Sequence, residues 1–168
     1  MNFAKINQQA VKTIIDGGKW GFKIPGYWDG DYLIITFDGY CAYFLPKKYV
    51  VFDKEHIQKT GKLFPDVDKI ALPENEVQLT RTYVESGVSV KGLLRVFKGK
   101  NNGKDYKTYV DSNMMKPLIK EQSIISYYQV PYEDRDRSLQ PIIACKSGSG
   151  IPLMALLPVR VHDQSEFD

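Results

Sequence analysis

The sequence predicts an α+β fold built from two pseudo-symmetric halves, each with one helix and an antiparallel sheet. Three observations indicate this class. Residues 6–16 carry apolar side chains at helical spacing, most of the remaining chain consists of short runs rich in Val, Ile, Tyr and Phe, and turn-forming residues separate those runs. A stripe of period 3.6 favours a helix, whereas β-branched and aromatic residues favour strands. At 168 residues, a single domain is the default.

The first half, residues 1–60, is expected to hold one helix and about four strands. The helix over residues 6–16 should end at Gly17-Gly18, because glycine readily adopts the left-handed conformation of a C-terminal cap. Asp38-Gly39 predicts a type I′ hairpin turn, which needs a positive φ at both central residues. Pro25-Gly26 is expected to stop the first strand. The strands are predicted over residues 20–24, 32–37, 40–45 and 49–52.

The second half, residues 77–161, follows a connector over residues 61–76 that glycine and proline interrupt. A helical turn near residues 54–60 precedes that connector. Pro117 fits only in the first turn of a helix, so a second helix is expected to begin near Asn113 or later. Residues 100–104 have the composition of a hairpin turn. The strands of this half are predicted over residues 77–84, 90–98, 106–110, 124–130, 142–146 and 151–161, and residues 162–168 are expected to form a flexible tail.

Composition excludes several classes of protein. Two cysteines in 168 residues cannot form a disulfide framework. Cys41, His56, Cys145 and His162 never stand at zinc-ligand spacing, so no metal or cofactor is predicted. The chain carries none of the common catalytic signatures, which favours a protein that is not an enzyme. The formal net charge of +3 is too small to indicate a nucleic-acid partner by itself.

The chain also carries no sign of export or membrane insertion. Residues 1–6 contain no apolar signal segment, and the longest apolar run, residues 151–159, is far shorter than the roughly 20 residues of a membrane helix. Free cysteines suit a reducing compartment. We therefore expect a cytoplasmic protein without a membrane partner.

Three segments in the second half resemble one known family. Residues 153–161, with the sequence LMALLPVRV, resemble the closing strand of bacterial DNA sliding clamps, the β subunits of DNA polymerase III. Residues 109–118 are similar to that family's strand leading into a helix, and residues 142–150 to its penultimate strand and turn. The resemblance is best over residues 105–161. Family clamps carry two or three such domains per chain and close a ring of six, whereas this chain has room for one.

The resemblance implies a non-enzymatic clamp-like domain that acts in DNA replication or related DNA transactions. Clamp domains turn their helices toward double-stranded DNA, and the matching contacts here are non-specific, salt-sensitive contacts to phosphates. Replication proteins and further copies of the chain are the other partners implied. The alternative interpretation is an ordinary solvated helix face, since Asp16 and Glu121 dilute the positive charge. The implied DNA-binding residues are Lys5, Lys12 and Lys19 from the first helical region, and Lys116 and Lys120 from the second.

Residues 98–107 form a separate basic stretch. Lysines alternate there with aromatic residues, in the order Phe97, Lys98, Lys100, Lys104, Tyr106, Lys107 and Tyr109. Interleaved cations and rings are typical of surfaces that neutralise and stack on nucleic acid. A solvated hairpin tip explains the same pattern.

Two further binding surfaces are predicted. Family clamps bind short partner peptides in an apolar pocket to which the closing strand contributes, and the matching positions are Ala155, Leu157, Pro158 and Val159. The alternative is that these aliphatic residues belong to the core. A different class of function, a small-molecule or carbohydrate-binding module, would use Tyr27, Trp28, Tyr127 and Tyr128 as an aromatic surface. An enzyme without a sequence signature is the third possibility.

Overall fold

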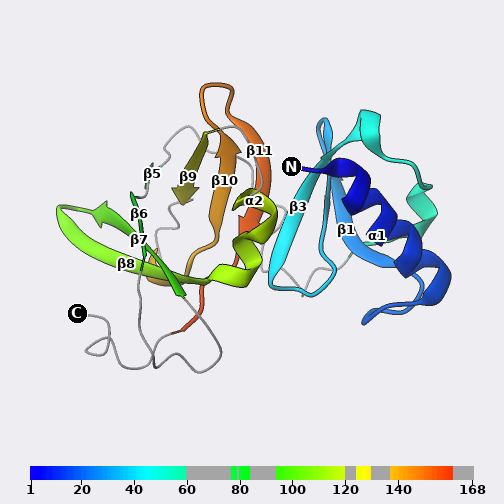
Figure 1. Ribbon diagram of the computed structural model, residues 1–168, viewed down its shortest axis with the longest axis horizontal. Helices are drawn as coiled ribbons and strands as arrows, with labels where there is room; N and C mark the ends of the chain where they lie inside the picture. The colour runs from blue at the N-terminus through cyan, green and yellow to red at the C-terminus, as the bar shows by residue number, and fades with distance from the viewer. Residues whose placement is uncertain (60–76, 79, 84–93, 120–123, 130–136, 161–168) are drawn as a thin grey trace. The chain divides into compact units, whose positions relative to one another are not determined.

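The computed structural model describes residues 1–59, 77–78, 80–83, 94–119, 124–129 and 137–160. The chain divides into two compact units, residues 1–71 with 153–155, and residues 72–152 with 156–168 (Figure 1). Both helices and strands are present, and strands predominate, which confirms the predicted α+β class. The predicted connector 61–76, Lys120 and the predicted tail 162–168 lie outside the described residues.

The first unit combines one helix with strands in the order β4-β1-β2-β3. Strand β1 pairs antiparallel with β2 and parallel with β4, and β2 pairs antiparallel with β3. Helix α1 lies over these strands (Figure 1). The elements are α1 (Phe3–Asp16), β1 (Ile24–Asp29), β2 (Tyr32–Ile35), β3 (Cys41–Pro46), the one-turn 3-10 helices η1 (Lys47–Tyr49) and η2 (Lys54–His56), and β4 (Ile57–Gln58).

Helix α1 begins three residues before its predicted start because Asn2 caps it. The Asn2 side chain accepts a hydrogen bond from the Lys5 amide at 3.2 Å, which satisfies one of the free N–H groups of the first turn. The helix ends as predicted, where Gly17 adopts φ +74° and its N–H donates to the Thr13 carbonyl. Its buried stripe packs on the sheet in one core cluster, formed by Ile6, Ala10, Ile24, Leu33, Ile35 and Leu45.

Pro25 and Gly26 lie inside β1, so the prediction that they stop a strand is wrong. The Pro25 carbonyl accepts a hydrogen bond from the Thr36 amide at 3.0 Å. A Cβ at Gly26 would stand 2.5 Å from the Ile34 carbonyl oxygen, so glycine is what allows β2 to approach this closely. The predicted strands over residues 20–24 and 49–52 are also wrong, since β1 begins at Ile24 and residues 47–49 form η1.

The hairpin at Asp38-Gly39 is confirmed, but its turn differs from the predicted type I′. Only Gly39 has a positive φ there, and residues 36–40 separate β2 from β3. The Asp38 carboxylate accepts hydrogen bonds from the amides of Tyr40 at 2.8 Å and Cys41 at 3.3 Å, and this holds the wider loop. The predicted turn chemistry occurs instead at Asn102 and Gly103, where φ is +49° and +78° between β7 and β8.

The second unit contains a three-stranded antiparallel sheet, β6-β7-β8, and a second set of strands hydrogen-bonded in the order β10-β9-β5. Strand β11 follows β10 in the order of strands, and its residues 153–155 are counted with the first unit. The predicted strand 77–84 is in fact two strands in different sheets, whereas the strand 142–146 is confirmed residue for residue. The elements are β5 (Val77–Gln78), β6 (Thr80–Tyr83), β7 (Leu94–Asn101), β8 (Lys104–Asp111), η4 (Ser112–Met115), α2 (Lys116–Ile119), β9 (Ile125–Gln129), η5 (Arg137–Leu139), β10 (Ile142–Lys146) and β11 (Ile151–Leu156).

The second helical segment lies where it was predicted but is short. Asp111 accepts a hydrogen bond from the Asn113 amide at 2.7 Å and so begins the 3-10 turn η4. Helix α2 then spans four residues, with Pro117 in its first turn. Pseudo-symmetry between the two halves stays a prediction. In the described part of the chain, no helix has the length and apolar character needed to cross a membrane.

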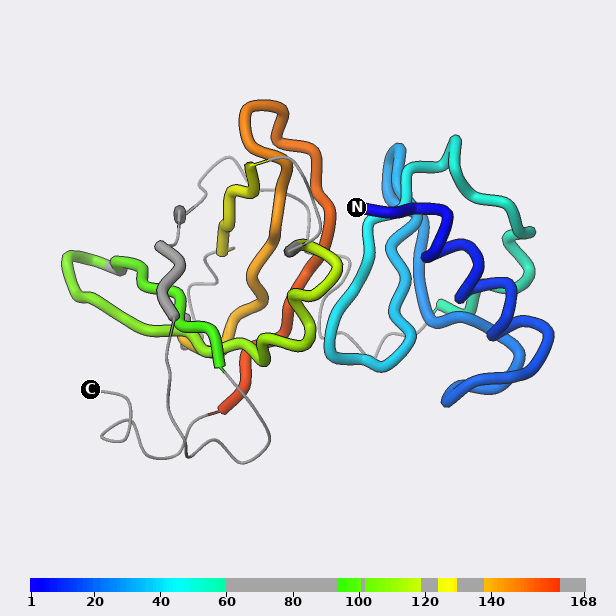
Figure 2. The backbone as a smooth tube through the Cα atoms, viewed as in Figure 1, coloured from blue at the N-terminus to red at the C-terminus, as the bar shows by residue number. Residues whose placement is uncertain are grey.

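A buried amide, that of Asn7, joins helix α1 to the chain that follows β3. Its Nδ2 donates to the carbonyls of Phe3 at 3.1 Å and Tyr49 at 2.6 Å, and its Oδ1 accepts from the Val51 amide at 3.3 Å. Figure 2 shows this chain returning past α1 on its way to β4. The rings of Phe3 and Tyr49 stack beside this connection, with centroids 5.1 Å apart. One side chain thus satisfies two backbone groups of this segment, the Tyr49 carbonyl and the Val51 amide.

Replacing Asn7 by leucine should lower the free energy of unfolding by about 2–3 kcal/mol, because the Tyr49 carbonyl and the Val51 amide lose their partner. Denaturant unfolding measures the change. Gln9→Leu is the matched control, since Gln9 is exposed on the same helix, and its effect should stay within about 0.5 kcal/mol. Equal effects of the two substitutions would contradict the role assigned to Asn7.

Candidate functional site

The hairpin of β7 and β8 extends beyond its sheet. Strand β6 pairs with β7 from Tyr83↔Arg95 to Thr80↔Lys98. Past Lys98, β8 is the only described strand that pairs with β7, through Gly99↔Tyr106 to Asn101↔Lys104. Among the described strands, the two-stranded part therefore begins after the Lys98–Lys107 pair, and residues 98–107 form the outer end of a hairpin closed by the turn at Asn102-Gly103 (Figure 1). We call these residues the β7–β8 arm.

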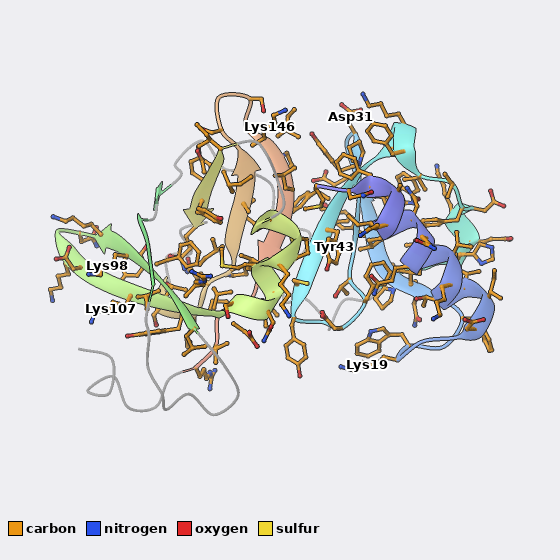
Figure 3. The ribbon with its side chains drawn as sticks, viewed as in Figure 1. Lys19, Asp31, Tyr43, Lys98, Lys107 and Lys146 are labelled. Carbon is orange, nitrogen blue, oxygen red and sulfur yellow. The ribbon has the colours of Figure 1, made fainter. Side chains whose placement is uncertain are left out.

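The arm is strongly basic. Lys98, Lys100 and Lys104 are exposed, and Lys107 is partly buried. Lys98 stands directly opposite Lys107 in the register, and both are labelled on the arm in Figure 3. The one carboxylate of the arm, Asp105, lies 3.8 Å from the Lys100 ammonium, and both side chains are exposed. Four lysines and one aspartate leave the arm with three net positive charges.

The base of the arm is anchored in the core. Val96, Phe97, Tyr109 and Val110 are all buried, which covers both faces of the hairpin there. The Phe97 ring packs against Tyr127 with centroids 5.0 Å apart. Phe97 and Tyr109 therefore cannot stack on nucleic acid, one of the two interpretations of this stretch, because their side chains fill the core. The arm presents charge on a fixed support instead of a stacking surface.

The predicted lysines of the first helical region differ from one another. Lys5 and Lys12 are exposed and, seven residues apart, lie on one face of α1. Lys19 is held within its own unit (Figure 3): its ammonium donates to the Asp38 carbonyl at 3.1 Å and lies 4.9 Å and 5.5 Å from the ring centroids of Trp20 and Tyr40. Lys5 and Lys12 are thus the available cations of this group.

The second predicted helix contributes less than expected. Lys116 is exposed at the start of α2, and Lys120 lies outside the described residues. Of the predicted pair, Lys116 is therefore the one whose position is described. Lys116 and the arm belong to the second unit, whereas Lys5 and Lys12 belong to the first.

The predicted partner-binding residues are partly core. Ala155 is fully buried in β11, which ends at Leu156 instead of the predicted 161. Leu157, Pro158 and Val159 are partly buried and follow the strand. The Val159 amide donates to the Tyr109 carbonyl at 2.7 Å, which fixes this segment beside β8. Ala155 fits the core interpretation, and the three residues after it remain accessible in part.

The four predicted ligand-binding aromatics do not form an exposed surface together. Tyr127 is buried against Phe97, so it belongs to the core. Trp28 is partly buried, and the ammonium groups of Lys47 and Lys54 lie 5.7 Å and 5.5 Å from its ring centroid. A ring that already contacts two cations is not a free platform for a sugar.

One group of metal-ligand side chains exists among the described residues. Asp53, Glu55 and His56 each place a donor atom within 4.8 Å of the others. Sequence analysis did not single out this group. The two carboxylates are exposed, and their proximity follows from their being neighbours in one turn of η2.

Cys41 lies at the start of β3, beside the Asp38 loop. It is buried, and burial together with the nearby Asp38 carboxylate raises the pKa of its thiol to about 12. Burial likewise raises the pKa of the neighbouring Tyr43, whose hydroxyl oxygen lies 3.7 Å from the Cys41 sulfur. A thiol that stays protonated at neutral pH is a poor nucleophile. Cys41 therefore packs as a small apolar side chain.

In comparisons of the chain with protein-family models, curated proteins and solved structures, no match was found. Functional inference therefore rests on the geometry of the chain itself. All four lysines of the arm belong to the basic stretch predicted over residues 98–107. The position of Lys98 opposite Lys107 was not predicted, and it follows from the register set by the Asn102-Gly103 turn.

The stability of the protein should fall as the pH rises above about 9, with a contribution from Cys41. An unfolded thiol ionises near its ordinary pKa of 9.0, whereas the folded one stays protonated up to about 12, so the unfolded state binds fewer protons in this interval. One such group contributes a slope of about 1.4 kcal/mol per pH unit. Urea denaturation at a series of pH values gives the free energy of unfolding as a function of pH. Above pH 9, this free energy should fall less steeply with pH in Cys41→Ala than in the unaltered protein, by that amount, and at neutral pH the two slopes should be equal. Equal slopes throughout would contradict the assigned environment.

Proposed function

We propose that this protein is a non-enzymatic nucleic-acid-binding protein whose β7–β8 arm contacts the phosphates of double-stranded DNA. The observation that carries this proposal is the position of Lys98 directly opposite Lys107, with Lys100 and Lys104 exposed toward the tip. A nucleic-acid backbone carries its negative charges at close, regular spacing, so a short hairpin with several lysines can contact more than one phosphate at a time.

The arm favours backbone contacts over base stacking. Its lysines are long, hydrated point charges, and the buried rings at its base are not available to stack on bases. A two-stranded β-ribbon fits the major groove of B-form DNA, which is about 12 Å wide. Phosphate contacts by lysine carry no sequence information, so the binding is non-specific and weakens steeply with salt.

The wider proposal places this binding in DNA replication or related transactions. It rests on the resemblance of residues 105–161 to a sliding-clamp domain. In that form Lys5, Lys12 and Lys116, all exposed, are further DNA contacts, and several copies of the chain assemble around the duplex. Light scattering of the purified chain with and without DNA distinguishes DNA binding by the arm from assembly into a ring. A strict monomer that still binds DNA would support the arm as the contact surface and would contradict the ring.

Reversing two charges on the arm should weaken DNA binding. In Lys98→Glu/Lys104→Glu, we expect the dissociation constant for a duplex to rise at least about tenfold, because both phosphate contacts are lost and repulsion replaces them. The slope of log K against log salt should become shallower by about two. Fluorescence anisotropy with a labelled duplex at several salt concentrations measures both quantities.

The matched control is Lys23→Glu/Lys59→Glu, which changes the net charge equally at two exposed lysines of the first unit. Its effect should be much smaller. Equal loss in the two double variants would mean that overall charge, not the arm, drives binding. A third double variant, Lys12→Glu/Lys116→Glu, tests the helix contacts that the clamp-like form requires.

A further inference from the structure

Helix α1 and the chain after η1 form the two walls of an apolar groove in the first unit. The groove encloses about 490 Å³, within the range of roughly 300–1,000 Å³ that is typical of binding pockets. Phe3, Ala4 and Val11 line it from the helix, and Tyr49 and Val51 line it from the other wall.

The groove leaves apolar side chains in contact with water. Val51 is 69% exposed and Tyr49 is 44% exposed. Ile15 is 68% exposed. It lies eleven residues after Ala4 and four after Val11, so the three side chains share one face of α1 and form an apolar stripe along it. A contiguous exposed apolar surface of this kind marks an interaction site more often than isolated apolar residues do.

The walls of the groove are fixed in advance. The Asn7 side chain bonds to the Tyr49 carbonyl and the Val51 amide, and the rings of Phe3 and Tyr49 stack. A binding site that is already formed avoids the cost of ordering its walls on association.

The rim of the groove is basic on both sides. Lys5 and Lys12 flank Gln8, which lines the groove, and the Lys48 ammonium lies 5.1 Å from the centroid of the Tyr49 ring on the opposite wall. Helix α1 has no acidic residue in its first turn, where the helix dipole is positive. Residues 47–51, with the sequence KKYVV, add no acidic residue. The surface therefore complements an apolar partner that carries negative charge.

We propose that this groove binds an amphipathic helix of a partner protein, with apolar residues on one face and acidic residues on its flanks. The second wall is not a strand at residues 50–52, so the groove offers no strand edge for an extended peptide to join. A helix laid along α1 places apolar side chains at helical spacing against the stripe of Ala4, Val11 and Ile15. A second copy of the chain would bring the lysines of two α1 helices against each other, which disfavours self-association.

The probe for this site is a labelled synthetic helical peptide with leucine along one face and glutamate at the other positions. Its counterpart has lysine in place of every glutamate. In fluorescence anisotropy, the glutamate peptide should bind at least about tenfold more tightly than the lysine peptide. Val51→Asp should weaken its binding by at least about tenfold. Ile124→Asp is the matched control, because Ile124 is an 80% exposed aliphatic residue in the second unit, and it should leave peptide binding unchanged.

A second variant leaves the apolar walls intact. Lys48→Glu should weaken the glutamate peptide and strengthen the lysine peptide, a change of preference that partial unfolding cannot produce. Binding of duplex DNA by Val51→Asp should match the unaltered protein, which keeps this site distinct from the arm. Absence of glutamate-peptide binding at millimolar concentration, or binding that Val51→Asp leaves unchanged, overturns the proposal. So does a dimer in light scattering that Val51→Asp dissociates, which assigns the groove to a second copy.

Discussion

The first unit depends on one buried amide group. A 14-residue helix that buries only Ile6, Asn7 and Ala10 fully is marginal by itself, so its position must come from tertiary contacts. Asn7 supplies two of them, to the Tyr49 carbonyl and the Val51 amide, and its third bond, to the Phe3 carbonyl, lies within the helix. A buried polar group with all its partners satisfied fixes a geometry that apolar packing alone leaves variable. The two tertiary bonds place Tyr49 and Val51 beside the helix. The groove is thus a consequence of how the helix is held.

In the second unit, a comparable buried connection supports the arm. Gln129 on β9 donates from its Nε2 to the Thr108 hydroxyl at 3.3 Å and to the Gln140 carbonyl at 2.9 Å. Thr108 lies on β8, so the bond joins the three-stranded sheet to the strands that include β9 and β10. With Phe97 packed on Tyr127, the inner end of the hairpin is held by polar and apolar contacts together. The charged outer end of the hairpin extends from a base that these contacts hold in place.

Local signals in the sequence predicted the elements well, and distant contacts explain the failures. The turn at Asn102-Gly103 and the strand 142–146 need only neighbouring residues to be recognised. Pro25-Gly26 is predicted to stop a strand, yet it lies inside β1. Glycine is needed there because β2 approaches closely, and a local sequence pattern does not reveal that approach. The four lysines of the arm belong to a stretch that the sequence singles out, whereas the pairing of Lys98 with Lys107 depends on strand register. The groove at Val51 depends on the Asn7 bonds. The exposure of both proposed binding surfaces, the arm and the groove, therefore depends on strand register and tertiary hydrogen bonds more than on composition.

The distribution of charge shows why the net value misleads. Residues 98–107 hold four lysines and one aspartate, a net +3 that equals the charge of the whole chain. The other residues therefore sum to zero, and a modest total conceals one concentrated patch. Because screening limits electrostatic attraction to about 10 Å at ordinary salt, the local density of charge, not the total, determines what a surface attracts. The first unit holds ten lysines and eight acidic residues, so its excess of positive charge is small and spread over 71 residues. The lysines beside the groove therefore select the charge of an apolar partner through their local position. An arm that attracts phosphates and a groove that sorts apolar helices by charge can thus coexist on a nearly neutral chain.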